Sequence, residues 1–207
     1  SWPFLHNHMH PLSFHMSFNK LYSLTSIHLE GNPVTEDEHF LEKLPFDEFI
    51  TIRPENLKAA YVPKDATTIV PRLFEIFKDE NILFLPRYES EKKFAEGYKN
   101  IWYPEKPLVG LDVCYYTKAM LTGAGTFARE AALLGVPAVS FFPRNEFLTV
   151  DVVLQEQGKE FKSRDPQEIK NYVETAKRSE ASVDRSKEVL KEVLDIFDEI
   201  IDKVKEK

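Results

Sequence analysis

The sequence has little cysteine and no long hydrophobic run. Its 207 residues include one cysteine, Cys114, and no apolar segment approaches the roughly 20 residues of a membrane-spanning helix. One cysteine excludes an internal disulfide framework and is consistent with a reducing cytoplasm. The opening Ser-Trp-Pro lacks the basic segment and apolar core of a secretory signal. We therefore expect a cytoplasmic protein without membrane spans.

Positive charge is scarce relative to negative charge. The chain has 27 Lys and Arg against 34 Asp and Glu, which gives a formal net charge of -7 at pH 7. This balance produces no basic field and argues against nucleic acid as the principal partner. Hydrophobic residues make up 43% and aromatic residues 13% of the chain. The length and composition are sufficient for one large or two small globular domains with a real core.

Histidine is nearly absent after residue 28. Five of the six histidines lie in residues 1–28, which show no helical or strand period. His6, His8 and His10 are two residues apart and could share a metal ion in an extended segment, because alternate side chains point to one face. An irregular arm, or the remnant of an upstream domain, is the plainer interpretation, and we expect no metal site. A histidine general base would have to come from this segment or from another chain.

From residue 46 onward, apolar segments of strand length alternate with segments of helical periodicity. Because the strands are apolar on both faces, they favour a parallel sheet with helices on either side. We predict a three-layer, Rossmann-like α/β domain with a mainly parallel sheet over residues 29–181, followed by an amphipathic C-terminal helix over 182–207. Strands are expected at 46–53, 81–87, 100–103 and near 161, and helices at 67–79, 89–98, 111–118, 147–157 and from Pro166, with Asp165 as its N-cap.

Glycine is also scarce, and three of the seven glycines lie in one unit between Leu121 and Pro143. The unit opens Leu-Thr-Gly-Ala-Gly-Thr-Phe-Ala-Arg-Glu and predicts strand, tight loop, helix and strand, with Thr126 capping the helix. The first N–H groups of a helix lack intrahelical partners and lie at the positive end of its dipole, so the loop suits an anion such as a phosphate. Neither Gly-x-Gly-x-x-Gly nor a Walker loop is present.

Several side chains near the predicted strand ends could contact such an anion. Arg53, Arg87 and Arg144 would lie near one mouth of the sheet, where guanidinium forks suit phosphate oxygens; simple solvated charges are the alternative. Glu130, about one turn into the helix, can accept hydrogen bonds from vicinal hydroxyls such as those of a ribose, or favour the helix dipole and pair with a neighbour. Cys114 lies in an apolar, aromatic stretch, which favours a buried structural thiol over a nucleophile.

The block from Gly123 to Pro143 resembles the nucleotide-binding unit in the C-terminal domain of GT-B-type nucleotide-sugar enzymes. It is similar above all to domain-of-unknown-function family 354, whose members look like relatives of UDP-N-acetylglucosamine 2-epimerase and of the peptidoglycan N-acetylglucosaminyltransferase. Arg53-Pro54-Glu55-Asn56 is similar to the epimerases' His-Arg-Arg-Glu-Asn, with matches at Arg53, Glu55 and Asn56. The resemblance covers about residues 29 to 178.

The resemblance implies that the backbone of Ala124, Gly125 and Thr126 holds a diphosphate, that Glu130 holds the ribose and that Arg53 approaches the phosphates. Two features depart from the pattern. Ile52 stands where the epimerases have the histidine of their motif, and only about 28 residues precede Leu29, where GT-B enzymes place a second Rossmann-like domain. The expected nucleotide-sugar site comprises Arg53, Glu55, Asn56, Arg87, Gly123, Ala124, Gly125, Thr126, Glu130 and Arg144.

These observations predict a protein that binds the nucleotide-diphosphate part of an activated, UDP-linked sugar as the donor-binding half of a glycosyltransferase-like GT-B protein. No cofactor besides this ligand is expected. Catalysis would need a second domain or a partner subunit that supplies the missing N-terminal domain, and a homo-oligomer is the other partner considered. The alternatives are a UDP-N-acetylglucosamine 2-epimerase-like enzyme and a non-catalytic, truncated paralogue that acts as an oligomerising or binding module.

Overall fold

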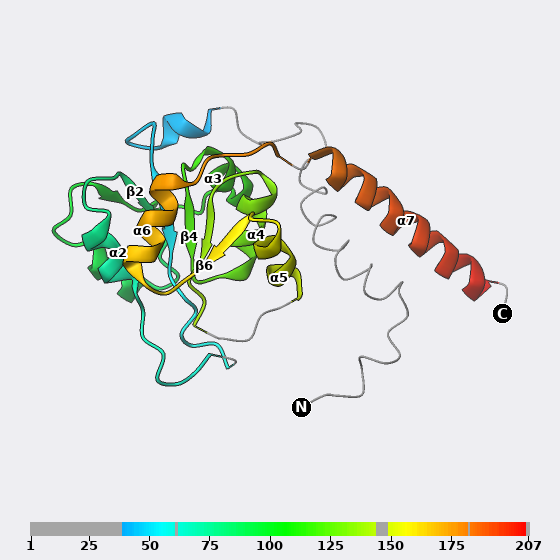
Figure 1. Cartoon of the computed structure of the whole chain (residues 1–207), viewed down its shortest axis with the longest axis horizontal. Coiled ribbons are helices and arrows are strands. Elements are labelled where there is room, and N and C mark those ends of the chain that lie inside the picture. Colours follow the sequence, from blue (N-terminus) through cyan, green and yellow to red (C-terminus); the bar gives the residue numbers. More distant parts are fainter. Residues whose placement is uncertain (1–38, 61, 144–148, 182, 206–207) are drawn as a thin grey trace. The chain divides into compact units, whose positions relative to one another are not determined.

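The computed structural model describes residues 39–60, 62–143, 149–181 and 183–205 (Figure 1). The chain divides into two units, of which one spans Val34–Ala181 and the other includes Ser182–Lys207. Within the described residues, the first unit contains a sheet of six strands in the order β3-β2-β1-β4-β5-β6. Each strand pairing is parallel, so the predicted parallel sheet is confirmed.

The strands are short, and those in the middle of the sheet are buried on both faces. The register places Ile52 of β1 beside Phe84 of β2 on one side and beside Leu121 of β4 on the other. These three side chains are fully buried, as expected for strands covered by helices on both faces. The strands are β1 (Ile50–Arg53), β2 (Ile82–Phe84), β3 (Ile101–Trp102), β4 (Met120–Thr122), β5 (Ala138–Ser140) and β6 (Glu160–Lys162).

Helices form the two outer layers. The apolar side chains of α2 (Val70–Ile76), η2 (Glu89–Ala95) and α6 (Pro166–Thr175) join one core with the Ile52 face of the sheet. On the opposite face α4 (Gly125–Leu133) packs on β4 and β5, flanked by α3 (Gly110–Tyr116) and α5 (Thr149–Glu156). A short 3-10 helix, η1 (Phe40–Lys43), precedes β1. This is the predicted three-layer α/β arrangement.

Two local predictions have different outcomes. The predicted N-cap of α6 is confirmed, because the Asp165 carboxylate accepts the N–H groups of Gln167 and Glu168 at 2.8 and 3.1 Å. The helix predicted at 89–98 is instead the 3-10 helix η2. Gly97, with a φ of +87°, follows it and adopts a conformation that an α-helix cannot continue through.

The second unit contains α7 (Val183–Lys205), which corresponds to the predicted C-terminal helix. Apolar residues recur along it at helical spacing and form one stripe. Five of them, with 47 to 69% of their surface exposed, are Leu194, Phe197, Ile200, Ile201 and Val204. Among the described helices, none combines the length and apolar character required to cross a membrane.

Candidate functional site

The strand order places a topological switch point at the neighbouring strands β1 and β4. The chain proceeds from β1 to β2 on one side and later returns to place β4 on the other, so the connections diverge at this point. The last residues of the two strands, Arg53 and Thr122, are paired in register, and the N–H of Gly123 donates to the Arg53 carbonyl at 3.0 Å. Ligands of open α/β sheets bind beyond the carboxyl ends of the strands at such a switch point. Loops 53–56 and 123–126 lie at that edge.

Gly123 allows these two loops to touch. A Cβ atom on Gly123 would lie 2.5 Å from Cα and 2.6 Å from the backbone N of Glu55, which is closer than such atoms can approach. The N–H of the next residue, Ala124, donates to Oγ1 of Thr122 at 2.9 Å. The backbone donors of Gly123 and Ala124 are therefore already engaged within the loop.

The first turn of α4 supplies the open backbone donors. The helix begins at Gly125 with Ala124 as its N-cap residue, and no side chain of the described residues caps it. The prediction that Thr126 is the cap is wrong, because Thr126 is the second helical residue. N–H groups in an uncapped first turn lack intrahelical partners and lie at the positive end of the helix dipole. Gly125 and Thr126 thus offer donors suited to an anion.

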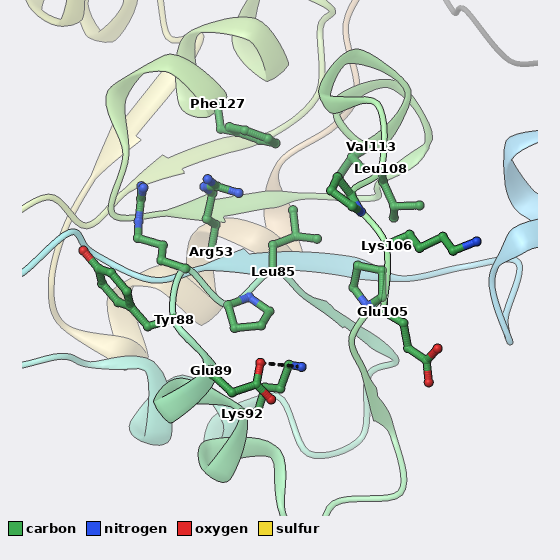
Figure 2. Close-up of a pocket in the computed structure, with 14 residues that line it drawn as sticks. Arg53, Leu85, Tyr88, Glu89, Lys92, Glu105, Lys106, Leu108, Val113 and Phe127 are labelled. Atoms are coloured by element: carbon green, nitrogen blue, oxygen red, sulfur yellow. Dashed lines mark ion pairs between the residues drawn. The ribbon is translucent and has the colours of Figure 1, made fainter.

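Arg53 brings a partly buried positive charge to the same place. Its guanidinium carbon lies 4.7 Å from the centroid of the Phe127 ring, and Figure 2 shows the side chain pointing toward that ring. Within the described residues, the Nε atom of Arg53 is buried and has no hydrogen-bond partner. Burial first, and the positive charge of Arg87 second, lower the pKa of Arg53 from its usual value. An anion would satisfy the donor and offset both effects.

Arg53 and Arg87 border a pocket of about 360 Å³, which is large enough for part of a small-molecule ligand. The Nε of Arg87 donates to the carbonyl of Pro54 at 2.8 Å and so holds this side chain at the rim. Figure 2 shows Leu108 and Val113 across the pocket from Arg53. The full lining is Arg53, Leu85, Pro86, Arg87, Tyr88, Glu89, Lys92, Pro104, Glu105, Lys106, Pro107, Leu108, Val113 and Phe127.

Glu55 and Asn56 are held by other protein groups. The Glu55 side chain is fully buried, and its carboxylate accepts hydrogen bonds from Oγ1 of Thr68 at 2.7 Å and from Nη1 of Arg164 at 3.0 Å. The side-chain oxygen of Asn56 accepts the hydroxyl of Tyr88 at 2.9 Å. Both side chains therefore fix the loop that follows β1.

Glu130 and Cys114 lie near Arg53. Glu130 is half-buried on α4, and its negative charge partly offsets the lowering of the Arg53 pKa. Burial, with a smaller effect of Glu130, raises the pKa of the Cys114 thiol well above its usual value. A fully buried, neutral thiol is a poor nucleophile, which fits the structural interpretation of Cys114.

Arg144, a predicted ligand contact, lies outside the described residues. The histidines of residues 1–28, considered above for a metal ion or a general base, also lie outside them. In the part of the chain that the structure describes, no group of three or more His, Cys, Asp and Glu side chains is arranged to hold a metal ion.

Two residues of this region, Phe127 and Arg164, were not predicted from the sequence. Phe127 is the third residue of α4, and its position in the first turn after the glycine loop could have indicated that it lies close to the site. Arg164 reaches Glu55 from 109 residues further along the chain. No local pattern reports a contact of that separation.

A parallel sheet between two helical layers, with an uncapped helix at its switch point, defines a Rossmann-like domain. The family described as "Protein of unknown function (DUF354)" matches residues 26–207, and the chain belongs to this family. A relative from Methanocaldococcus jannaschii, named Uncharacterized protein MJ0665, is 36% identical over 109 residues, which cover 51% of this chain and 31% of the relative.

Solved structures show the same fold. The UDP-GlcNAc 2-epimerase of Methanocaldococcus jannaschii, in complex with UDP-GlcNAc and UDP, superposes with a TM-score of 0.60 at 19% identity over 86% of this chain and 52% of its own. The UDP-GlcNAc 2-epimerase of Neisseria meningitidis, bound to UDP-GlcNAc, gives 0.52 at 13% identity, again over 86% and 52%. At these identities the likeness is one of fold alone. The chain spans about half the length of these solved relatives.

Proposed function

We propose that this chain binds the diphosphate of a UDP-linked sugar beyond the carboxyl ends of β1 and β4, as the donor-binding half of a glycosyltransferase-like GT-B protein. The observation that carries the proposal is the proximity of the uncapped first turn of α4 to the partly buried guanidinium of Arg53, which lies against Phe127 of that turn. Backbone N–H groups at a helix start and a guanidinium fork are both well suited to phosphate oxygens. Arg87 adds a second positive charge at the rim.

The remaining site residues divide into ligand contacts and supports. In this proposal Glu130 accepts hydrogen bonds from the ribose hydroxyls, the apolar wall of the pocket contacts the base, and Arg144 approaches the phosphates. Gly123, Ala124, Glu55 and Asn56 shape the two loops, since their backbone or side-chain groups bond within the protein. The UDP and UDP-GlcNAc named for the solved epimerases support this ligand class.

Catalysis, in this proposal, requires groups from elsewhere. The positive charges of Arg53 and Arg87 at the pocket contribute electrostatic stabilisation of a leaving diphosphate. The acceptor site and a general base would come from a second domain or a partner subunit. The exposed apolar stripe of α7 supports a partner or a second copy of the chain as its cover.

Two alternative functions rest on different observations. The fold shared with UDP-GlcNAc 2-epimerases favours an epimerase, but Ile52, which replaces the histidine of the epimerase motif, is fully buried within β1 and cannot exchange protons with a substrate. The exposed stripe of α7 favours a non-catalytic module that works by association with other chains.

Calorimetric titration with UDP, UDP-GlcNAc, pyrophosphate and uridine tests the proposed function. We expect UDP and UDP-GlcNAc to bind, pyrophosphate to bind more weakly and uridine to bind weakest, because the diphosphate provides most of the polar contacts. Absence of binding at millimolar UDP would contradict both nucleotide-sugar hypotheses. Binding of uridine as tight as that of UDP would contradict a diphosphate site.

The Glu130→Ala variant tests the ribose contact. It should weaken UDP binding about tenfold, as expected for the loss of hydrogen bonds to a charged acceptor, and leave pyrophosphate binding unchanged. Glu156→Ala, which removes an exposed carboxylate on α5, is the matched control. If Glu130→Ala binds UDP as the wild type does, its assigned role is wrong.

A further inference from the structure

Arg164 joins three segments at the carboxyl-end edge of the sheet. It follows β6, and its Nη1 atom donates to the carbonyl of Phe141 at 2.5 Å and to Glu55 Oε1 at 3.0 Å. Its Nη2 atom donates to the carbonyl of Thr67 at 2.6 Å. One guanidinium therefore connects the loop after β1, the segment before α2 and the end of β5.

The Glu55 end of this connection is rigid. Its carboxylate is fully buried and also accepts Oγ1 of Thr68 at 2.7 Å and the N–H of Ile69 at 3.3 Å. A buried carboxylate with this many donors has little freedom to move, and removal of its charged partner would leave it uncompensated.

The loop fixed by Arg164 is also the one that shapes the diphosphate site. The backbone of Glu55 lies against Gly123 so closely that no Cβ fits between them. Arg53, two residues before Glu55, accepts the N–H of Gly123 through its carbonyl. A shift of Glu55 would therefore move both the guanidinium that faces Phe127 and the loop that leads into α4.

We propose that Arg164 is a positioning residue for the diphosphate site, which it sets through Glu55 without contacting the ligand. The inference rests on the proposed function. Arg164 is not among the residues that line the pocket, and its planar fork reaches acceptors in three directions, which the single ammonium of a lysine cannot reproduce. The geometry thus predicts that charge alone does not suffice at this position.

The test compares UDP affinity with thermal unfolding for the wild type, Arg164→Lys, Arg164→Met and the double variant Arg164→Met with Glu55→Gln. We expect Arg164→Lys to weaken UDP binding about tenfold. The double variant removes both charges, so it should recover thermal stability relative to Arg164→Met alone while UDP binding stays about tenfold weaker. Arg72→Lys, which alters an exposed arginine on α2, is the control and should bind UDP like the wild type.

A second measurement needs no ligand. Hydrogen exchange of the Gly123 amide should be faster in Arg164→Lys than in Arg72→Lys, because the bond from Gly123 to the Arg53 carbonyl depends on the loop that Arg164 holds. Wild-type UDP affinity in Arg164→Lys and Arg164→Met, or affinity that recovers together with stability in the double variant, would overturn this inference alone. Absence of UDP binding by the wild type would overturn the proposed function, and the inference with it.

Discussion

Glu160 should make the stability of this fold decrease as the pH rises through neutrality. It begins β6, is only 4% exposed and, within the described residues, has its Oε2 atom buried without a hydrogen-bond partner. Burial first, and the negative charge of Asp151 second, raise the pKa of Glu160 from 4.5 to about 7, although Arg129 and Lys162 act in the opposite direction.

The sign follows from proton binding. Between the two pKa values the folded protein keeps a proton that the unfolded chain has released, so the free energy of unfolding falls as the pH rises. The stabilising contribution is complete below the unfolded value of 4.5 and is lost as the pH passes through about 7. At about 1.36 kcal/mol per pKa unit, this shift corresponds to about 3 kcal/mol.

The Glu160→Gln variant keeps the shape of the protonated acid but cannot titrate. Urea unfolding, followed by tryptophan fluorescence, should give similar stabilities for variant and wild type near pH 5, and a variant more stable by about 2.5 kcal/mol near pH 8. Glu156→Gln, at an exposed position of α5, should show no such change. A stability difference between Glu160→Gln and wild type that is equal at both pH values would show that Glu160 does not titrate with a raised pKa in the folded protein.

Three further predictions follow from single positions. Arg53→Met should leave the unfolding free energy, measured with urea, within about 1 kcal/mol of the wild type, because it removes a poorly solvated charge. The same variant should bind UDP at least about tenfold more weakly in calorimetry, and UDP binding as strong as that of the wild type would contradict this prediction. Gly135→Ala should lower the free energy of unfolding by about 2 kcal/mol or more, since φ is +74° and the new Cβ would lie 2.1 Å from the carbonyl oxygen of Ser179. Gly158→Ala, with φ of +68° and open space around the new Cβ, should lower it less in the same urea unfolding assay. Cys114 should react with a thiol reagent only after unfolding, because burial raises its pKa; rapid labelling of the native protein would show otherwise.

The sheet and its layers could be predicted because apolar periodicity is a local property of the sequence. Ile52, Phe84 and Leu121 lie in apolar runs, and their burial on both faces follows from a parallel sheet. The ends of helices and strands, and the type of each helix, were harder to predict from the sequence. The segment at Glu89 became a 3-10 helix, and the Glu91 carboxylate there accepts the N–H groups of Arg87 and Tyr88, a side-chain contact that periodicity does not report.

The candidate site could be placed at the strand ends but not resolved into roles. The N–H of Ala124 donates to Oγ1 of Thr122. The backbone donors without an intrahelical partner therefore begin at Gly125, one residue later than predicted from the sequence. Glu55 has the polar character of a ligand contact, yet its surroundings include Arg164 from 109 residues away. Long-range contacts of this kind decide whether a carboxylate faces solvent or the interior, and the sequence alone does not encode them in a readable pattern.

Backbone amide chemical shifts recorded during a UDP titration report directly on the proposed diphosphate donors. If the first turn of α4 binds the diphosphate, the largest shifts will occur at Gly125 and Thr126. The amide chemical shifts of Gly97 and Gly158, which precede the amino ends of β3 and β6, should not change. UDP-induced shifts that spare α4, or no shifts at saturating UDP, would contradict the proposed diphosphate site.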